Sequence, residues 1–426
     1  MNTQEVIITW ATPVFFALIA LELLVAKLRG RSVYHSTDAI NSLGLGVISQ
    51  IVAVFSKLLT LGIYAWCVQR FALFALPANS VWVWITALLC YDFFYYWLHR
   101  AGHEVNILWA AHVVHHQSED YNLSTALRQT GSGVLLGWLF YLPMAIVGFP
   151  LEVFVVVALI DLLYQFWVHT ELVGRLGWFD RVFCSPSNHR AHHAVNDKYL
   201  DRNYGGILIV WDRLFGTFVE EDDTDPPVYG TRAPLRSWNP LWANAEVYWA
   251  TAKDAWHARH WSDKLRVWLK PPGWRPADVA ERFPKPAFDI ERERYLPALS
   301  RGLTIYSLVQ FALLLGMAVQ FLDLAKHLAA VELLGYAVFL VLSLTALGAL
   351  TEGRRIGVGL ELARLLATAA VPLLTGGWFG VPRLPAGTIG AGAAVLAVSA
   401  AVVLWLTAST TGQIGSDKAV SGRPSP

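Results

Sequence analysis

Long apolar segments are the feature of this sequence that most restricts its fold. A helix needs about 20 mostly apolar residues to cross a hydrocarbon core of about 30 Å. Nine segments approach that length, and they cover residues 6–26, 40–65, 81–98, 133–148, 151–168, 303–322, 331–350, 358–374 and 388–406. Only 15% of the residues are charged, against about 25% in an average soluble chain. We therefore predict an all-α integral membrane protein, a multi-span helical bundle with eight or nine spans.

Basic residues in short loops indicate the orientation of the spans, because cytoplasmic loops collect Lys and Arg. Lys27, Arg29 and Arg31 follow the first apolar segment, and Arg354 and Arg355 follow the seventh. Alternating the spans places both loops on the cytoplasmic side, together with residues 99–132 and 169–301. The first segment lacks the flanks of a cleaved signal peptide, so we expect it to be retained. The predicted location is a bacterial inner membrane or, in a eukaryote, the endoplasmic reticulum.

Composition divides the chain into five predicted regions. Residues 1–80 hold N-terminal membrane spans, residues 81–220 a core with grouped histidines, residues 221–300 a cytoplasmic segment, residues 301–410 C-terminal spans, and residues 411–426 a disordered tail. The net charge of +1 supplies no field that would gather nucleic acid, so we expect no nucleic-acid partner.

A tryptophan pattern marks the cytoplasmic segment. Trp242, Trp249 and Trp256 recur every seven residues, which is about two helical turns, so they share one helical face. Trp261 and Trp268 follow, and Lys253, Arg259, Lys264, Arg266 and Lys270 interleave with the tryptophans from Trp249 onward. This composition is typical of a helix that lies in the lipid headgroup region, and the alternative is a helix packed on the rest of the protein.

Nine of the 13 histidines lie between residues 99 and 193, in three spaced groups and one single position. The groups, which we call boxes one to three, are His99 and His103, then His112, His115 and His116, then His189, His192 and His193, with His169 alone between the last two. Spacings of three and four place side chains on one helical face, about 5–6 Å apart. In each three-histidine box the first histidine therefore shares a face with both of the others.

The predicted topology brings these boxes to one membrane face. Box one ends the third span, and the fourth and fifth spans form a hairpin that returns the chain to the same surface at His169. Eight or nine neutral nitrogen ligands exceed what one ion accepts, so we predict a site for two metals. Imidazole suits iron, zinc, copper and nickel alike, and the pattern does not choose among them.

Acidic residues beside the boxes allow several roles. His103 and Glu104 begin like the HExxH zinc motif, but Ile107 stands where its second histidine belongs, so that motif is absent. Glu104 is a candidate ligand, base or partner of a histidine ring, or simply an acid at headgroup level. Glu119 and Asp120 carry the same ambiguity. The other four histidines and the three cysteines fit no metal pattern, and we treat them as ordinary residues.

The three boxes resemble those of the fatty acid hydroxylase and sterol desaturase superfamily. A narrower resemblance, to the alkylglycerol monooxygenase family, runs from residue 91 to residue 218 and includes the stretches 99–129, 163–171, 203–206 and 211–217. The superfamily implies a histidine-bound diiron centre that uses O2 on lipid C–H bonds. It also implies that the eight box histidines bind iron, that His169 is an additional ligand, and that Glu104 is needed for activity. Asn188 departs from the pattern, since a histidine is expected there in the animal members.

The narrower resemblance implies a particular reaction. The ether-bearing carbon of an alkylglycerol taken from the bilayer would be hydroxylated, and the resulting hemiacetal would separate into a fatty aldehyde and glycerol. The family uses tetrahydrobiopterin as electron donor, and a separate redox protein is the other candidate.

Two rival interpretations remain besides that of a purely structural membrane protein. One is another reaction of the same superfamily, namely hydroxylation or desaturation of a fatty acid, carotenoid or sterol. The other is a membrane metal transporter or sensor, which would place histidines or acids along a path through several spans. The histidines here gather at one face instead.

Overall fold

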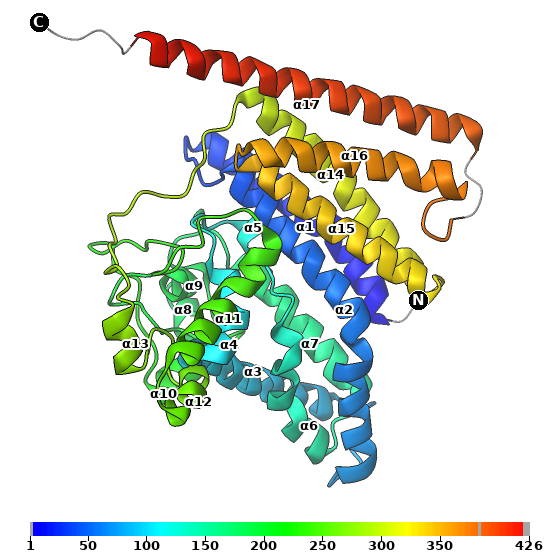
Figure 1. Cartoon of the computed structure of the whole chain (residues 1–426). Helices are drawn as coiled ribbons and strands as arrows, with labels where there is room; N and C mark the ends of the chain where they lie inside the picture. Colours follow the sequence, from blue (N-terminus) through cyan, green and yellow to red (C-terminus); the bar gives the residue numbers. More distant parts are fainter. Residues whose placement is uncertain (1–2, 382–384, 421–426) are drawn as a thin grey trace, which may run out of the picture. The chain divides into compact units, whose positions relative to one another are not determined.

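The computed structural model describes residues 3–381 and 385–420, which form two compact units (Figure 1). The first unit contains residues up to 235 and residues 242–294, and the second contains residues 236–241 and those from 295 onward. Both units are helical, and the described residues contain isolated β-bridges but no strand. The predicted all-α fold is confirmed.

Six helices are long and apolar enough to cross a membrane, judged by length and composition over the described residues. They are α2 (Ser36–Phe71), α3 (Val81–Glu104), α14 (Arg301–Leu324), α15 (Ala330–Thr351), α16 (Arg355–Thr375) and the stretch Gly387–Ala408 of α17 (Ala386–Val420). All six overlap predicted spans, and the protein is an integral membrane protein. Helices α1 (Thr3–Leu28) and α7 (Leu151–Trp167) cover the first and fifth predicted spans.

The fourth predicted span, residues 133–148, is not a single helix. It consists of two 3₁₀ helices, η1 (Gly133–Leu135) and η2 (Gly137–Tyr141), followed by the short helix α6 (Leu142–Val147). Glycines weaken a helix interior and proline fits only the first helical turn, so Gly133, Gly137 and Pro143 together break the segment. Gly148 then reverses the chain at φ +107, where an added Cβ would lie 1.9 Å from a carbonyl oxygen.

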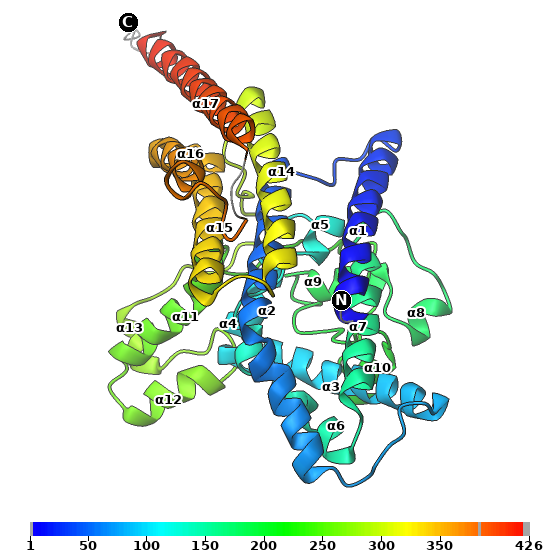
Figure 2. The same ribbon diagram turned by 90° about the vertical axis from the view of Figure 1, so that its right-hand side faces the viewer.

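The first unit brings the histidine-bearing helices together (Figure 2). Helix α3 continues past its apolar stretch through box one and ends at Val105, whose backbone is extended (φ −122, ψ 117). Helix α4 (Asn106–His116) then folds back against α3, which also packs against α7. Helix α4 lies close to Gly102, where an added Cβ would be in ordinary van der Waals contact with the His112 side chain at 3.5 Å.

Shorter helices complete the first unit, and the loops between them supply many of its polar contacts. These helices are α5 (Leu123–Ala126), α8 (Phe179–Val182), α9 (Pro186–His193), α10 (Val210–Phe215), α11 (Pro240–His257), α12 (Trp261–Leu269) and α13 (Ala277–Arg282). Helix α9 begins with a capped turn, in which the Ser185 side chain accepts a hydrogen bond from the backbone N–H of Asn188 and Pro186 occupies the first turn.

The second unit is a bundle of the four helices α14 to α17, in which α15 packs against both α14 and α16. A buried ion pair joins Arg364 to Glu361, with Arg364 Nε 2.8 Å from Glu361 Oε2. Tyr306 donates to the same carboxylate and Gln310 accepts from Arg364. Helix α17 includes residues 411–420, for which we predict disorder, and residues 421–426 lie outside the described residues.

Candidate metal centre

Nine histidines from α3, α4, α9 and the turn after α7 converge as two clusters of side chains. The first cluster contains His99, His103, His112, His116 and His192, and the second contains His115, His169, His189 and His193. In each cluster one ring nitrogen per residue lies within 4.8 Å of all the others. The clusters adjoin, since the rings of His116 and His193 stack with their centroids 4.2 Å apart. These are the nine residues that the sequence pattern indicates.

Each three-histidine box serves both clusters, which the spacing did not predict. On α4, His112 and His116 are four residues apart and join the first cluster, whereas His115 joins the second. On α9 the roles are reversed, because the four-residue pair joins the second cluster and His192 joins the first. The two helices therefore act as bridges, and each contributes ligand candidates to both sites.

One loop supports three of the five histidines in the first cluster. The carbonyl oxygen of Tyr204 accepts a hydrogen bond from His99 Nδ1 at 2.8 Å, and that of Arg202 accepts one from His192 Nδ1 at 2.8 Å. The Asp201 carboxylate lies 3.4 Å from His103 Nδ1. Such partners set the tautomer and the ring orientation, so that Nε2 keeps its lone pair and faces the cluster.

Asn203 holds this loop in place from its centre. Its side-chain N–H groups donate to the carbonyls of Asn188 (2.9 Å) and Val219 (2.8 Å), and its Oδ1 accepts from the Val219 N–H at 2.8 Å. Asn203 has φ +58 and Asp201 has φ +55, in the left-handed region that Asn and Asp tolerate better than other non-glycine residues.

The second cluster is supported by different elements. His115 Nδ1 donates to the Arg128 carbonyl at 2.9 Å, and His169 Nδ1 donates to the Gln165 carbonyl at 2.8 Å. The Arg128 side chain is fully buried, and its guanidinium donates to the carbonyl of Val114 and to Asn41 Oδ1. The histidines of the second cluster are therefore oriented by other backbone carbonyls than those of the first, although both clusters share the helices α4 and α9.

The donor atoms fit a cation. Because both Nδ1 atoms donate to carbonyls, the Nε2 atoms of His115 and His169 are both unprotonated, yet they lie 3.1 Å apart. Two lone pairs at that distance repel each other unless a positive charge lies between them. In the first cluster, His103 Nε2 and His192 Nε2 are buried without a hydrogen-bond partner. The five-nitrogen and four-nitrogen sets thus match what a metal ion requires.

Burial also favours the neutral imidazoles that metals bind. Removal from water lowers the pKa of His115 to about 4, against an ordinary value of 6.5. The same cause holds the pKa values of His189 and His193 well below their usual range. These rings are therefore unprotonated near neutral pH, with their lone pairs free for a cation.

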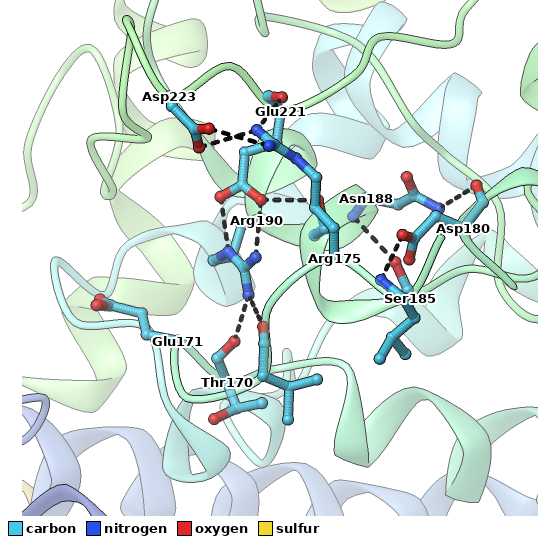
Figure 3. A network of polar contacts seen from close by, with 12 residues as sticks. Thr170, Glu171, Arg175, Asp180, Ser185, Asn188, Arg190, Glu221 and Asp223 are labelled. Carbon is cyan, nitrogen blue, oxygen red and sulfur yellow. Dashed lines mark hydrogen bonds and ion pairs between the residues drawn. The ribbon is translucent and has the colours of Figure 1, made fainter. Parts of the chain in front are cut away.

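Arg190, inside box three, fixes α9 through a polar network (Figure 3). It forms two hydrogen bonds of 2.7 Å to the Glu221 carboxylate and donates to the carbonyl of Thr170, the residue after His169. The Asn188 side chain donates to the carbonyls of Asp180 and Phe183, so it caps the preceding turn and is not part of either cluster.

The acidic candidates lie outside both clusters. Glu104 pairs with Arg100 at 2.9 Å, and its side chain is 43% exposed. Glu119 lies 3.5 Å from Arg292, and Asp120 accepts from His35 Nδ1 at 2.8 Å. None of these carboxylates is grouped with the histidine nitrogens among the described residues.

Sequence reasoning assigned no role to several buried polar residues that surround the clusters. Glu22 of α1 accepts hydrogen bonds from Thr170 Oγ1 at 2.5 Å and from the Leu123 N–H at 2.9 Å, which ties α1 to the segment after His169. A lone acid inside an apolar segment indicates a buried polar contact, because such residues are costly in membranes and usually have partners. Arg128 and Asn203 lie in polar loops and offer no comparable signal.

A comparison with known proteins agrees with this architecture. The family model described as fatty acid hydroxylase matches residues 84–217, which include all nine clustered histidines. Together with relatives that cover most of the chain, this match shows that the chain belongs to the fatty acid hydroxylase family.

The relatives that cover most of the chain are alkylglycerol monooxygenases. The chain is 38% identical to the alkylglycerol monooxygenase of Homo sapiens, over 84% of this chain and 80% of that protein. It is 38% identical to that of Danio rerio, over 83% and 79%. The ornithine lipid hydroxylase of Rhizobium tropici is 30% identical over 32% of this chain and 41% of its own length. No solved structure matches the chain significantly.

Proposed function

We propose that the protein is an O2-dependent lipid monooxygenase whose two histidine clusters each hold one iron ion. The observation that carries the proposal is the convergence of nine histidines as five-nitrogen and four-nitrogen sets with their Nε2 atoms facing inward. In the family, bound iron supplies the activation of O2 for attack on a C–H bond. Family membership and the alkylglycerol monooxygenase relatives support the same reaction class.

The spacing of the nitrogens supports a bound metal ion in each cluster. Two nitrogens bound at about 2.1 Å lie about 3.0 Å apart at an octahedral right angle and about 3.4 Å apart at a tetrahedral angle. The Nε2 atoms of His99 and His112 are 3.0 Å apart, those of His115 and His169 are 3.1 Å apart, and those of His189 and His193 are 3.2 Å apart. These separations lie between the two values, so they suit a metal ion in either geometry, and the choice of iron rests on family membership.

The proposed substrate is an alkylglycerol, in keeping with the relatives' names. One oxygen atom of O2 is inserted into a C–H bond of the ether-bearing carbon, and the other leaves as water after uptake of two electrons and two protons. The hemiacetal so formed breaks its C–O bond to give a fatty aldehyde and glycerol. Tetrahydrobiopterin is the proposed electron donor.

The chain's own groups keep the site oriented and dry. The backbone carbonyls of Arg128, Arg202 and Tyr204 hold imidazoles in one tautomer, and every clustered histidine except His112 is buried. We place the centre at the cytoplasmic membrane face, on the basis of the basic loops, so that a lipid chain reaches it from the bilayer.

We propose that Glu104 is required for turnover and that it acts through the residues that it contacts. It accepts from Arg100 Nε, and Arg100 also donates to the Tyr96 hydroxyl at 3.3 Å. Glu104→Gln is expected to lose activity while keeping its iron. Loss of iron in this variant would instead identify the carboxylate as a ligand.

The experiment starts from protein purified without oxygen, in which iron is quantified and aldehyde release from an ether lipid is measured with and without tetrahydrobiopterin. His115→Ala and His192→Ala remove one ligand candidate from each cluster, and both are expected to abolish aldehyde formation. The exposed His327, outside both clusters, provides the control His327→Ala. An iron-loaded protein with no activity on any alkylglycerol would refute the ether-cleaving form, and product analysis with fatty acids, carotenoids and sterols would then identify the reaction.

A further inference from the structure

The helices α11 and α12 present large apolar side chains to the outside of the first unit. Trp256 of α11 is 81% exposed, and Trp261 and Leu265 of α12 are 80% and 69% exposed. Leu265 and Leu269 follow Trp261 at intervals of four, so all three lie on one face of α12. Val267 on another face is 1% exposed. An apolar face of this kind marks a contact surface.

The exposed face is held rigidly in place. Asn106, the first residue of α4, donates through Nδ2 to the carbonyl of Val267 (2.9 Å) and to Thr251 Oγ1 of α11 (3.1 Å), and through its backbone to the Lys270 carbonyl (3.0 Å). Lys264 donates to the last carbonyls of α11. Figure 1 shows α12 beside α4, in agreement with their contacts.

The charge that accompanies this face is basic. Lys253, Arg259 and Arg266 are exposed. The acids nearby are largely withdrawn, since Asp254 is 12% exposed and bound by Arg275, and the side chain of Asp263 is 19% exposed and lies 3.3 Å from Arg266. Basic side chains beside exposed indoles match a lipid surface that carries anionic headgroups.

The position of α12 along the chain places it at the depth of the headgroups. Helix α3 is a candidate membrane span whose apolar stretch ends near residue 98, and α12 is hydrogen-bonded to Asn106, two residues after α3 ends. The six residue steps from Leu98 to Glu104 rise about 9 Å along the axis of α3 at 1.5 Å per residue, which brings Glu104 to the outer edge of the headgroup region. The headgroup region extends about 5–8 Å beyond the hydrocarbon core on each side.

We propose that the aromatic and basic face of α11 and α12, formed by Trp249, Trp256, Trp261, Leu265 and Leu269 with the three exposed basic residues, lies in the headgroup layer of the protein's own membrane and contacts anionic lipids. The contact is transmitted through Asn106 to α4, which carries box two. The membrane surface therefore orients the helix that contributes to both clusters.

The test uses the full chain, reconstituted in vesicles of phosphatidylcholine alone or mixed with phosphatidylglycerol. A nitroxide is attached at Leu265→Cys and, as the matched control, at Asp223→Cys, whose side chain is 87% exposed in the first unit. Collisions with O2, which concentrates in lipid, and with a water-soluble nickel chelate report the depth of each label, after subtraction of signal from the unmutated chain's own cysteines. No turnover is needed.

We expect O2 collisions to dominate at residue 265 and chelate collisions to dominate at residue 223, with deeper insertion at residue 265 when phosphatidylglycerol is present. Chelate access at residue 265 equal to that at residue 223 would overturn the proposal, and so would exclusion of both reagents, which indicates a protein partner. Neutralising Lys253, Arg259 and Arg266 together to glutamine should abolish the response to phosphatidylglycerol. A retained response would overturn the assignment of these residues to anionic lipid.

Discussion

Replacement of Asn203 with alanine is expected to empty the five-histidine cluster while the four-histidine cluster keeps its metal. The loop 201–204 supports His99, His103 and His192, all of the first cluster, whereas the second cluster depends on Arg128 and other elements. Asn203 also donates to the Asn188 carbonyl of α9, but Arg190 and Glu221 hold that helix separately, so this variant should affect the first cluster more than the second.

The magnitude follows from the contacts that Asn203→Ala removes. Three backbone groups, the carbonyls of Asn188 and Val219 and the N–H of Val219, lose their partner at a site where Asn203 and Asn188 are buried and Val219 is partly buried. An unpaired buried polar group costs about 1–3 kcal/mol, so the loop loses at least about 3 kcal/mol. Alanine at φ +58 adds about 1 kcal/mol. A total of about 4 kcal/mol corresponds to a change of nearly a thousandfold in the population of the ordered loop, since 1.4 kcal/mol is about tenfold.

The assay is the iron content of protein purified without oxygen, measured beside its helix content by circular dichroism. We expect iron to fall from about two ions per chain to about one, because loss of such outer partners weakens metal binding about 10–100-fold each. Asn203→Gly accepts the positive φ but lacks the side chain, so it should lose iron too. Full iron in the glycine variant would assign the effect to backbone strain, and equal loss from both sites in a folded protein would refute the stronger dependence of the first cluster on this loop.

Three other substitutions or conditions test the packing and the electrostatics. Gly206→Ala places a Cβ within 3.0 Å of two buried carboxylate oxygens and should lower stability by about 1–3 kcal/mol. The measurement is the melting temperature, which should be lower than that of the control Gly174→Ala, whose Cβ meets nothing within 4 Å. Glu361→Leu leaves Arg364 without its carboxylate and should destabilise the second unit by about 3–5 kcal/mol, whereas adding Arg364→Leu should recover most of the loss and leave the iron content unchanged; equal melting of the single and double variants would contradict this. In metal-free protein, the pKa of His115 is lowered to about 4 from 6.5. The unfolded chain therefore takes up a proton first as the pH falls, and the folded state loses stability between pH 6.5 and pH 4. Greater thermal stability at pH 5 than at pH 7 would contradict this.

Local patterns allowed part of the site to be predicted. Histidines three and four residues apart on helices are neighbours whatever surrounds them, so box one on α3, box two on α4 and box three on α9 followed from spacing. The return of the chain to His169 followed from the hairpin expectation, although the first arm of that hairpin is a broken helix and not a span. Apolar length similarly indicated the class of protein, because a lipid environment leaves a backbone few ways to satisfy its polar groups.

The division of the histidines between two clusters was decided only by tertiary structure. Spacing shows which side chains share a face, but the cluster that each one reaches depends on the rotation of α4 and α9 about their axes. Contacts with distant residues set that rotation, since Asn106 of α4 bonds α12 and Arg190 of α9 bonds Glu221. The carbonyls that orient the rings leave no trace in the sequence, because every residue has one. The sequence alone thus determined a membrane protein with nine histidines grouped for metal binding. The fold decided which histidines belong to which cluster, since that choice rests on contacts between residues far apart in the chain.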